Sequence, residues 1–459
     1  MAEQSNTMAS PSNSRHGGNI VHGSQDAVVF SSAASSATQQ LKKEDALRET
    51  DDFRNYLSQS SIAFFLLGAL VGLPCTTITA GAKAMFQGVT GAYGLCAFVT
   101  AAFTSLVAPT FAHHIPYSYR TIILTITGLA SFGICTVGSN QAGPVIGTML
   151  GGATYAFGMN TYLAVAASFP QYTVVSFSSG CGSSVVLGPA LYIVLMGPLG
   201  RAWKHVFLVC LCFPVLICAV WWVLLDDAGR RDADRVRKLA ITKARALECG
   251  SSDFICLQVG SDDSLPVVKE TKMGFGPGLT RTGLFFRLIL PRYVVPLLFC
   301  TMGSIICILG LSPTFQNLRL FRGSPENDLQ FEIYYFCYGM GQFSFSALSM
   351  KFKMTFIWGW ATLQMTIVAI GTVQLFHPFL EYYAVWAAIM FVVGACVGGG
   401  VTNTNYKIAD EFRRQNQPEE VRSYAMSYGG LGNFGGDALG GCLAILIEVL
   451  AKKHLSVRT

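Results

Sequence analysis

Long apolar segments make up most of this chain of 459 residues. A helix of about 20 apolar residues is long enough to cross the ~30 Å hydrocarbon layer of a lipid bilayer. The sequence predicts eleven such helices, six before and five after one basic loop. The expected spans are residues 60–81, 90–112, 119–139, 142–168, 173–197, 204–225, 289–312, 329–349, 354–376, 379–404 and 422–450. We therefore expect an all-α, polytopic membrane protein.

Composition agrees with a lipid environment. Apolar residues make up 51% of the chain, charged residues only 13%, and the mean hydropathy is +0.44. This is too little charge to cover a water-soluble globule of this size. The formal net charge is +6, but Lys and Arg lie mainly in the connections between apolar segments, as orientation signals do. We therefore expect the lipid bilayer as a partner and no nucleic acid.

The apolar segments divide the chain into four expected parts. Residues 1–58 contain too few large apolar residues to form a core, which predicts a disordered tail. A six-helix bundle (59–225), a basic loop (226–288) and a five-helix bundle (289–459) follow. Two bundles joined by a loop are typical of transporters of twice six helices, and the 6+5 arrangement here is what such a transporter looks like after losing its last helix. Such carriers bind a small-molecule solute between the halves near mid-membrane.

Basic residues predict the orientation of the chain. When the connections are assigned alternately to the two sides, the side of the amino terminus holds 23 Lys and Arg and the other side holds 8. Positive residues favour the cytosol, so the amino terminus and the 226–288 loop are expected to be cytosolic. Basic residues at the start of this loop indicate a helix on anionic lipid, a site for a cytosolic protein, or only an orientation signal. They are Arg230, Arg231, Arg235, Arg237, Lys238, Lys243 and Arg245.

Two runs of small, weakly polar residues lie in corresponding helices of the two halves. Small residues in a spanning helix either allow a neighbouring backbone to approach closely or line a hydrated passage. We expect both runs to line the solute pathway, with tight packing as the alternative. The residues concerned are Ser178, Ser179, Gly180, Gly182 and Ser183 in the fifth helix, and Asn433 and Asp437 in the last.

Asp437 is the only acidic residue expected well inside a span. Ionisable groups at membrane depth are costly and are functional candidates. Asp437 is therefore expected to accept a proton or pair with a cation, with a structural contact as the alternative. Glu332, Glu381 and Glu448 lie near span ends, where we expect solvation.

Basic residues near the ends of spans are weaker candidates. Lys83 and Arg422 are candidate charge contacts for a solute, provided that they point inward. The alternative, which also applies to Arg120, is that the side chain reaches the water at the membrane edge.

The tenth expected helix ends in a glycine-rich sequence, residues 398–406. We expect the glycines to break the helix there. Asn403 and Thr404, which follow them, are then candidates for a gate or a solute contact. The alternative is that the chain simply leaves the membrane at this point.

Three blocks of sequence resemble the battenin family of lysosomal and vacuolar membrane proteins. The similarity runs in order over most of the membrane part of the chain. The matching residues are Ala108-Pro109, Ile115–Arg120, Ser168–Pro170, Ser178–Gly180 with Gly182, Leu187-Gly188 and Leu191-Tyr192; then Asn403-Thr404, Ile408-Ala409, Arg422 and Tyr424–Met426; and, more weakly, Phe64 with Leu66–Gly68 and Val295–Leu297.

Several positions depart from the family pattern. Paired asparagines in the first span are Val71 and Gly72 here, an acidic residue in the fourth is Met159, an arginine in the eighth is Ser346, and an aspartate in the last is Asn433. Asp437 lies one turn beyond Asn433 and would restore a carboxylate on the same helical face.

The resemblance implies a fold similar to the major facilitator superfamily and a place in the membrane of a lysosome or vacuole. It also implies export of a glycerophosphodiester or a basic amino acid, with an effect on lumenal pH. We therefore expect a secondary carrier that works by alternating access. The alternative is a non-transporting scaffold or regulator of lysosomal trafficking and pH. A polar cavity between the halves would favour the carrier, and a bundle packed dry throughout would favour the scaffold.

Enzymatic activity is not expected. The sequence shows no P-loop, nucleophile elbow or HExxH motif. The 14 cysteines form no CxxC pair and no spacing typical of a metal site. We therefore expect no catalytic residues, cofactor or metal.

Overall fold

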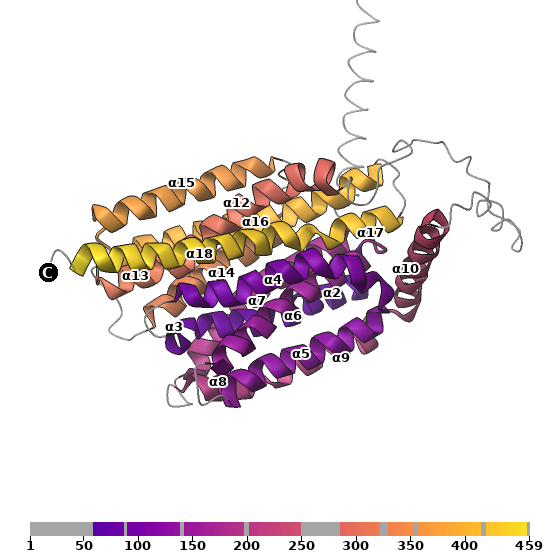
Figure 1. Ribbon diagram of the computed structural model, residues 1–459, viewed down its shortest axis with the longest axis horizontal. Coiled ribbons are helices and arrows are strands. Elements are labelled where there is room, and N and C mark those ends of the chain that lie inside the picture. The colour runs from indigo at the N-terminus through magenta and orange to yellow at the C-terminus, as the bar shows by residue number, and fades with distance from the viewer. Residues whose placement is uncertain are drawn as a thin grey trace, which may run out of the picture. The chain divides into compact units, whose positions relative to one another are not determined.

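The computed structural model describes residues 58–86, 90–137, 142–196, 202–248, 285–321, 329–349, 351, 354, 356–414 and 419–456. Nearly all of these residues are helical, and the long helices run side by side in one bundle (Figure 1). The expected disordered tail and the second part of the 226–288 loop lie outside the described residues.

The first half of the bundle contains six expected spans. Its elements are α2 (Gln59–Ala80), α3 (Ala82–Met85), α4 (Gly91–Phe111), η1 (Ala112–His114), α5 (Tyr117–Val137), α6 (Ala142–Ala166) and α7 (Gln171–Met196); the sixth span consists of α8 (Trp203–Cys210), α9 (Cys212–Ala219) and η2 (Val220–Leu224).

The second half contains the other five. Its first span consists of η4 (Phe285–Val294), α12 (Val295–Ile305), η5 (Ile306–Leu311) and α13 (Ser312–Asn317); α14 (Gln330–Leu348), α15 (Ile357–Phe376), α16 (Tyr383–Arg414), α17 (Glu419–Ser427) and α18 (Gly429–Ser456) follow. The all-α, polytopic architecture with six helices before and five after the loop is thus confirmed.

Nine helices in the described part of the chain are long and apolar enough to cross a bilayer. The helices α6 and α14 coincide with expected spans but are not among the nine. Both carry buried polar residues, such as Asn160 in α6 and Gln342 in α14. Polar residues are tolerated in a spanning helix where neighbouring helices enclose them.

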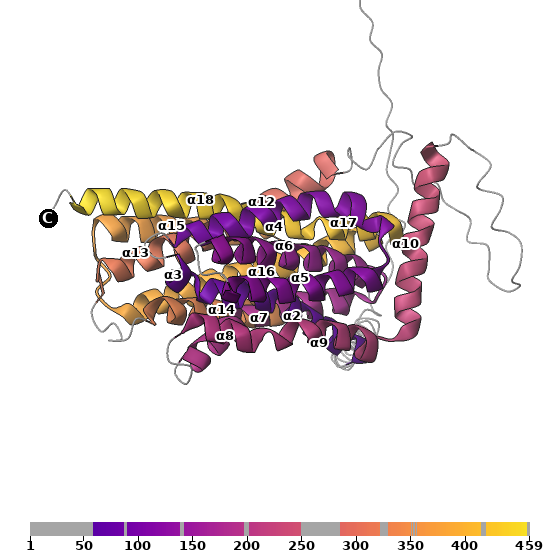
Figure 2. The same ribbon diagram turned by 60° about the horizontal axis from the view of Figure 1, so that its bottom comes forward.

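Two antiparallel helix pairs join the halves: α4 with α18, and α7 with α14. Figures 1 and 2 both show α18 alongside α4. Glycines bring each pair together. A Cβ added at Gly94 would lie 3.1 Å from the Cα of Gly441, and one at Gly339 would lie 2.3 Å from the carbonyl oxygen of Val185. Small residues therefore set the close approach of the halves.

The expected break in the tenth helix is wrong, because α16 continues through the glycines to Arg414. A Cβ added at Gly398 would lie 2.1 Å from the carbonyl oxygen of Gln342 in α14. The glycines thus allow α14 and α16 to pack closely. Asn403 and Thr404 are buried among neighbouring helices, so the chain does not enter open solvent at this point.

The first part of the basic loop forms a helix, α10 (Asp227–Glu248). It crosses one end of the bundle at a steep angle to the spanning helices (Figures 1 and 2). There it packs against η1 and α17. We call this end, which also holds the α4–α5 and α6–α7 turns, the α10 end, and the opposite end the α3 end.

Candidate solute site

A small cavity lies between the two halves of the bundle. Residues of α2, α4, α6 and α7 line it from the first half, and residues of the α12–η5 span, α14, α16 and α18 from the second. Its volume of about 50 Å³ has room for a few water molecules but not for an organic solute. Its polar lining residues are Thr76, Thr79, Tyr155, Tyr335, Tyr338, Gln342, Asn433 and Asp437.

Asp437 is the only charged residue among those that line the cavity. Its side chain comes from α18 and only 8% of the residue is exposed. No ion pair involving Asp437 occurs in the part of the chain that the structure describes. A carboxylate enclosed at membrane depth is costly without a positive partner, so this position favours a proton or a cation.

Close packing of α18 on α12 determines which face of α18, the one that carries Asp437, points toward the cavity. A Cβ added at Gly436 would lie 2.1 Å from the hydroxyl oxygen of Thr301. That hydroxyl donates to the carbonyl oxygen of Asn433 at 3.0 Å. Because α18 is held against α12 in this way, Asn433 and Asp437, one turn apart, both reach the cavity.

Aromatic rings form much of the remaining wall. The rings of Tyr335 and Tyr338 stack with their centroids 6.0 Å apart, and Tyr155 meets Phe434 edge to face at 5.1 Å. The faces of aromatic rings attract cations. A single carboxylate among tyrosines is therefore a site suited to a positively charged organic group.

A hydroxyl network supports the wall on the α2 side. The hydroxyl of Tyr93 lies 2.5 Å from that of Thr79 and donates to the carbonyl oxygen of Cys75 at 3.0 Å. These bonds satisfy polar groups that are buried beside the cavity.

The glycines of the fifth helix pack against neighbouring helices. A Cβ at Gly180 would lie 2.0 Å from the carbonyl oxygen of Phe65, and one at Gly182 would lie 3.1 Å from the hydroxyl oxygen of Ser346. These contacts match the packing alternative. The α7 residue that lines the cavity is Val185.

The serines of the same run are buried and do not line the cavity. Ser183 donates to the carbonyl oxygen of Gly180, and Ser178 accepts a hydrogen bond from the amide of Asn405 at 3.3 Å. Ser179 is fully enclosed. Contact of these residues with a solute, in a conformation that opens the bundle, stays a prediction.

Asn403 and Thr404 are likewise away from the cavity. The Asn403 amide donates to the hydroxyl of Ser349 at 3.1 Å, and its oxygen accepts from the backbone N–H of Met354 at 3.1 Å. Thr404 donates to the carbonyl oxygen of Gly400. Asn403 thus ties α16 to the segment between α14 and α15. A gating role for either residue stays a prediction.

The two candidate cations do not line the cavity. Lys83 lies in α3 and is partly exposed. Arg422 lies in α17 and donates to the carbonyl oxygen of Ala167, just after α6. Neither of them therefore contributes a positive charge to the cavity in this conformation.

Three charged residues expected in water at the membrane edge are enclosed by protein instead. Arg120 is 4% exposed and donates to the carbonyl oxygens of Ala112 and Ile115. Glu448 is 3% exposed and accepts from the backbone N–H of Gly91 at 3.3 Å, and Glu332 is buried as well. The expectation of solvation was wrong because neighbouring helices cover these span ends.

The sequence analysis missed the tyrosines of the cavity. Their signal is present in α14, where Tyr335, Tyr338 and Gln342 follow at spacings of three and four residues and so share one helical face. No group of three or more His, Cys, Asp or Glu residues suited to a metal ion occurs among the residues that the structure describes.

Comparisons with known proteins place these features in context. The CLN3 protein family matches residues 61–454. The chain is 26% identical over 402 residues to Protein BTN1 of Debaryomyces hansenii, covering 84% of this chain and 92% of that protein. It is also 26% identical over 350 residues to Battenin of Canis lupus familiaris, covering 74% and 72%. Among solved structures it is similar to the major facilitator proton:xylose symporter XylE, with a TM-score of 0.49 and 13% identity, over 87% of this chain and 96% of that one.

Proposed function

The chain belongs to the CLN3 protein family, and from this membership and the cavity between its halves we propose that it is a carrier of the lysosomal or vacuolar membrane. It moves a small polar solute by alternating access. The observation that carries this proposal is the small, partly polar cavity at the contact of the two halves, since a scaffold would not need one.

The lining of the cavity favours a solute with a positively charged group. Asp437 would pair with this group, and the faces of Tyr335 and Tyr338 would surround it. A basic amino acid fits this description, and so does the choline end of a glycerophosphodiester. A phosphate would need a positive partner, and no Lys or Arg is among the lining residues. We therefore propose that the positively charged group of the solute enters the cavity first and binds beside Asp437.

Contacts at both ends of the bundle support a conformation that is closed on both sides. At the α3 end, Glu448 of α18 accepts from Gly91 of α4. At the α10 end, Arg422 of α17 donates to Ala167, and Arg413 of α16 donates to the carbonyl oxygen of Phe169 at 3.5 Å. Each contact joins one half to the other. Solute entry requires the contacts at one end of the bundle to separate while the contacts at the other end stay intact.

The carboxylate also provides a link to lumenal pH. If Asp437 binds either the cationic solute or a proton, each transport cycle exchanges one for the other. Export of solute from an acidic compartment would then change the number of protons in that compartment.

Uptake into proteoliposomes tests the proposal. The purified protein is assayed with labelled arginine, glycerophosphocholine and glycerophosphate, the last of which carries no cation. We expect uptake of arginine or glycerophosphocholine and none of glycerophosphate. Asp437→Asn should lower uptake roughly 100-fold, because it removes the charge that pairs with the solute.

Asp410→Asn is the matched control. Asp410 lies on α16 outside the cavity and pairs with the exposed Arg414 at 2.9 Å, so its loss should leave uptake unchanged. Uptake of glycerophosphate at the same rate as arginine would contradict the cation-first assignment. Absence of uptake for every solute would favour the scaffold.

A further inference from the structure

The α10 helix has two chemically different faces. Ala233 and Arg237 are buried against the bundle. Arg231, Arg235 and Lys238 are exposed, and their spacing of four and three residues places them together on the other face. One face therefore attaches the helix to the protein, and the other presents cations.

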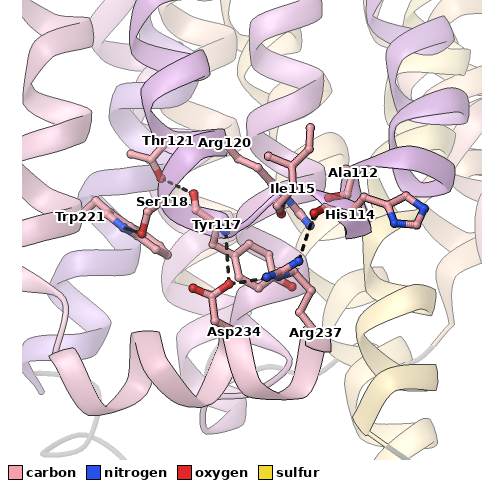
Figure 3. A network of polar contacts seen from close by, with 10 residues as sticks. All are labelled: Ala112, His114, Ile115, Tyr117, Ser118, Arg120, Thr121, Trp221, Asp234 and Arg237. Carbon is pink, nitrogen blue, oxygen red and sulfur yellow. Dashed lines mark hydrogen bonds and ion pairs between the residues drawn. The ribbon is translucent and has the colours of Figure 1, made fainter. Parts of the chain in front are cut away.

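Polar contacts fix α10 in place at the α10 end (Figure 3). Asp234 accepts from the backbone N–H of Tyr117 at 3.4 Å and from Arg237 at 3.1 Å. Arg237 also donates to the carbonyl oxygen of His114 at 3.3 Å. The exposed cations thus have a defined position relative to the α4–α5 turn, unlike cations on a freely moving loop.

The cationic face borders an open cavity of about 560 Å³. Four basic residues and two carboxylates line it, which leaves an excess of positive charge. Both carboxylates already have partners, because Asp227 pairs with Arg230 and Asp234 pairs with Arg237. The lining residues are Arg230, Arg231, Arg235 and Lys238 with Asp227, Asp234, Ser118 and Trp222.

An exposed apolar surface adjoins this cavity. Trp222 lines the cavity and is 42% exposed, and its neighbour Val223 is 74% exposed. Ile122 lies one turn after Ser118 on α5 and is exposed as well. Exposed apolar residues on spanning helices face lipid chains, and tryptophan concentrates at the level of the headgroups. Cations beside exposed apolar side chains are the combination expected where hydrocarbon gives way to lipid phosphate.

We propose that this cavity binds an anionic phospholipid. The headgroup phosphate lies against Arg235 and Lys238, and an acyl chain lies along Trp222 and Val223. The charge of the cavity would also suit a soluble phosphate, but the apolar surface beside it matches only a lipid. The site is separate from the solute cavity, so the proposal does not depend on transport.

Native mass spectrometry of the full-length protein in mixed nanodiscs tests this site. The nanodiscs contain phosphatidylcholine with either phosphatidylserine or a phosphatidylinositol phosphate. We expect the protein to retain an anionic lipid in preference to phosphatidylcholine. The double substitution R235Q/K238Q should reduce this preference roughly 10- to 30-fold, because each basic residue near anionic lipid contributes about tenfold or less. The variant keeps Asp234 and Arg237, whose contacts are drawn in Figure 3, so α10 should stay attached.

K204Q/K453Q is the control, because it removes the same charge at the α3 end. It should keep the preference of the unmodified protein. Equal retention of both lipid classes by the unmodified protein would overturn the proposal, as would an equal loss in both double variants. Displacement of the retained lipid by inorganic phosphate would assign the cavity to a soluble anion and overturn it too.

Discussion

The cavity between the halves and the polar network at the α10 end enclose charge in opposite ways. In the network, Arg120 and Arg237 donate to backbone carbonyl oxygens, and Asp234 accepts from two groups (Figure 3). In the cavity, Asp437 has no ion pair within the described chain. An enclosed charge with partners mainly holds structure, whereas one that lacks them is available to a ligand. The comparison separates structural charges from the candidate solute-binding charge.

Substitution of Arg120 should have the largest effect on stability. Arg120→Met removes the side-chain donor to the carbonyl oxygen of Ile115 and leaves that of Ala112 with only the backbone N–H of Ile115, so the free energy of unfolding should fall by about 2–4 kcal/mol. Denaturant unfolding in detergent micelles measures this change. Transport per folded molecule should stay within about twofold, because Arg120 does not line the cavity.

Two further variants test the contrast between the structural charge of Arg120 and the candidate solute-binding charge of Asp437. Arg414→Met removes an exposed arginine with one ion pair and should cost less than about 1 kcal/mol. Asp437→Asn should leave stability unchanged or higher while it lowers transport. If Asp437→Asn destabilised the protein as much as Arg120→Met, Asp437 would be a structural charge and the contrast would be lost.

Moving the carboxylate by one turn should have an intermediate effect. Asn433 and Asp437 both line the cavity, so N433D/D437N keeps one acid and one amide on the same face. We expect uptake within about tenfold of the unmodified protein, against a roughly 100-fold loss for D437N alone. Kinetics of arginine uptake measure both. Complete inactivity of the double variant would mean that the position of the acid matters more than its presence on this face.

Changes at the aromatic wall should have the smallest effect. Tyr338→Leu removes a ring face beside the proposed cation and should raise the KM about tenfold, whereas Tyr338→Phe keeps the ring and should change it less than about threefold. The KM for arginine distinguishes the two. Equal effects of Leu and Phe would indicate that the hydroxyl of Tyr338, and not its ring, contributes to binding.

Much of the architecture could be predicted from local sequence. The length and hydropathy of each segment indicated α helices in six-plus-five order, and the isolated acid in the last helix indicated Asp437 as a candidate. These properties belong to single segments. A helix that must satisfy its own backbone inside a bilayer needs no distant partner to form.

Other features could not be predicted in this way. The glycines of α16 looked like a helix break, but they allow contact with Gln342 of α14. Arg120 and Glu448 looked solvated because they lie near span ends, but neighbouring helices cover both. Gly180 was expected to line the solute pathway, with packing as the alternative, and its contact with Phe65 shows packing in this conformation.

The sequence by itself determined that this protein is a membrane-spanning helical bundle in two halves and that one acid lies deep within it. The tertiary structure decided which faces of those helices meet. It placed Asp437 among tyrosines at the contact of the halves and α10 with its cations beside an exposed tryptophan. The physical reason is that hydropathy and helix length depend on neighbours in sequence, whereas the environment of a side chain depends on residues hundreds of positions away.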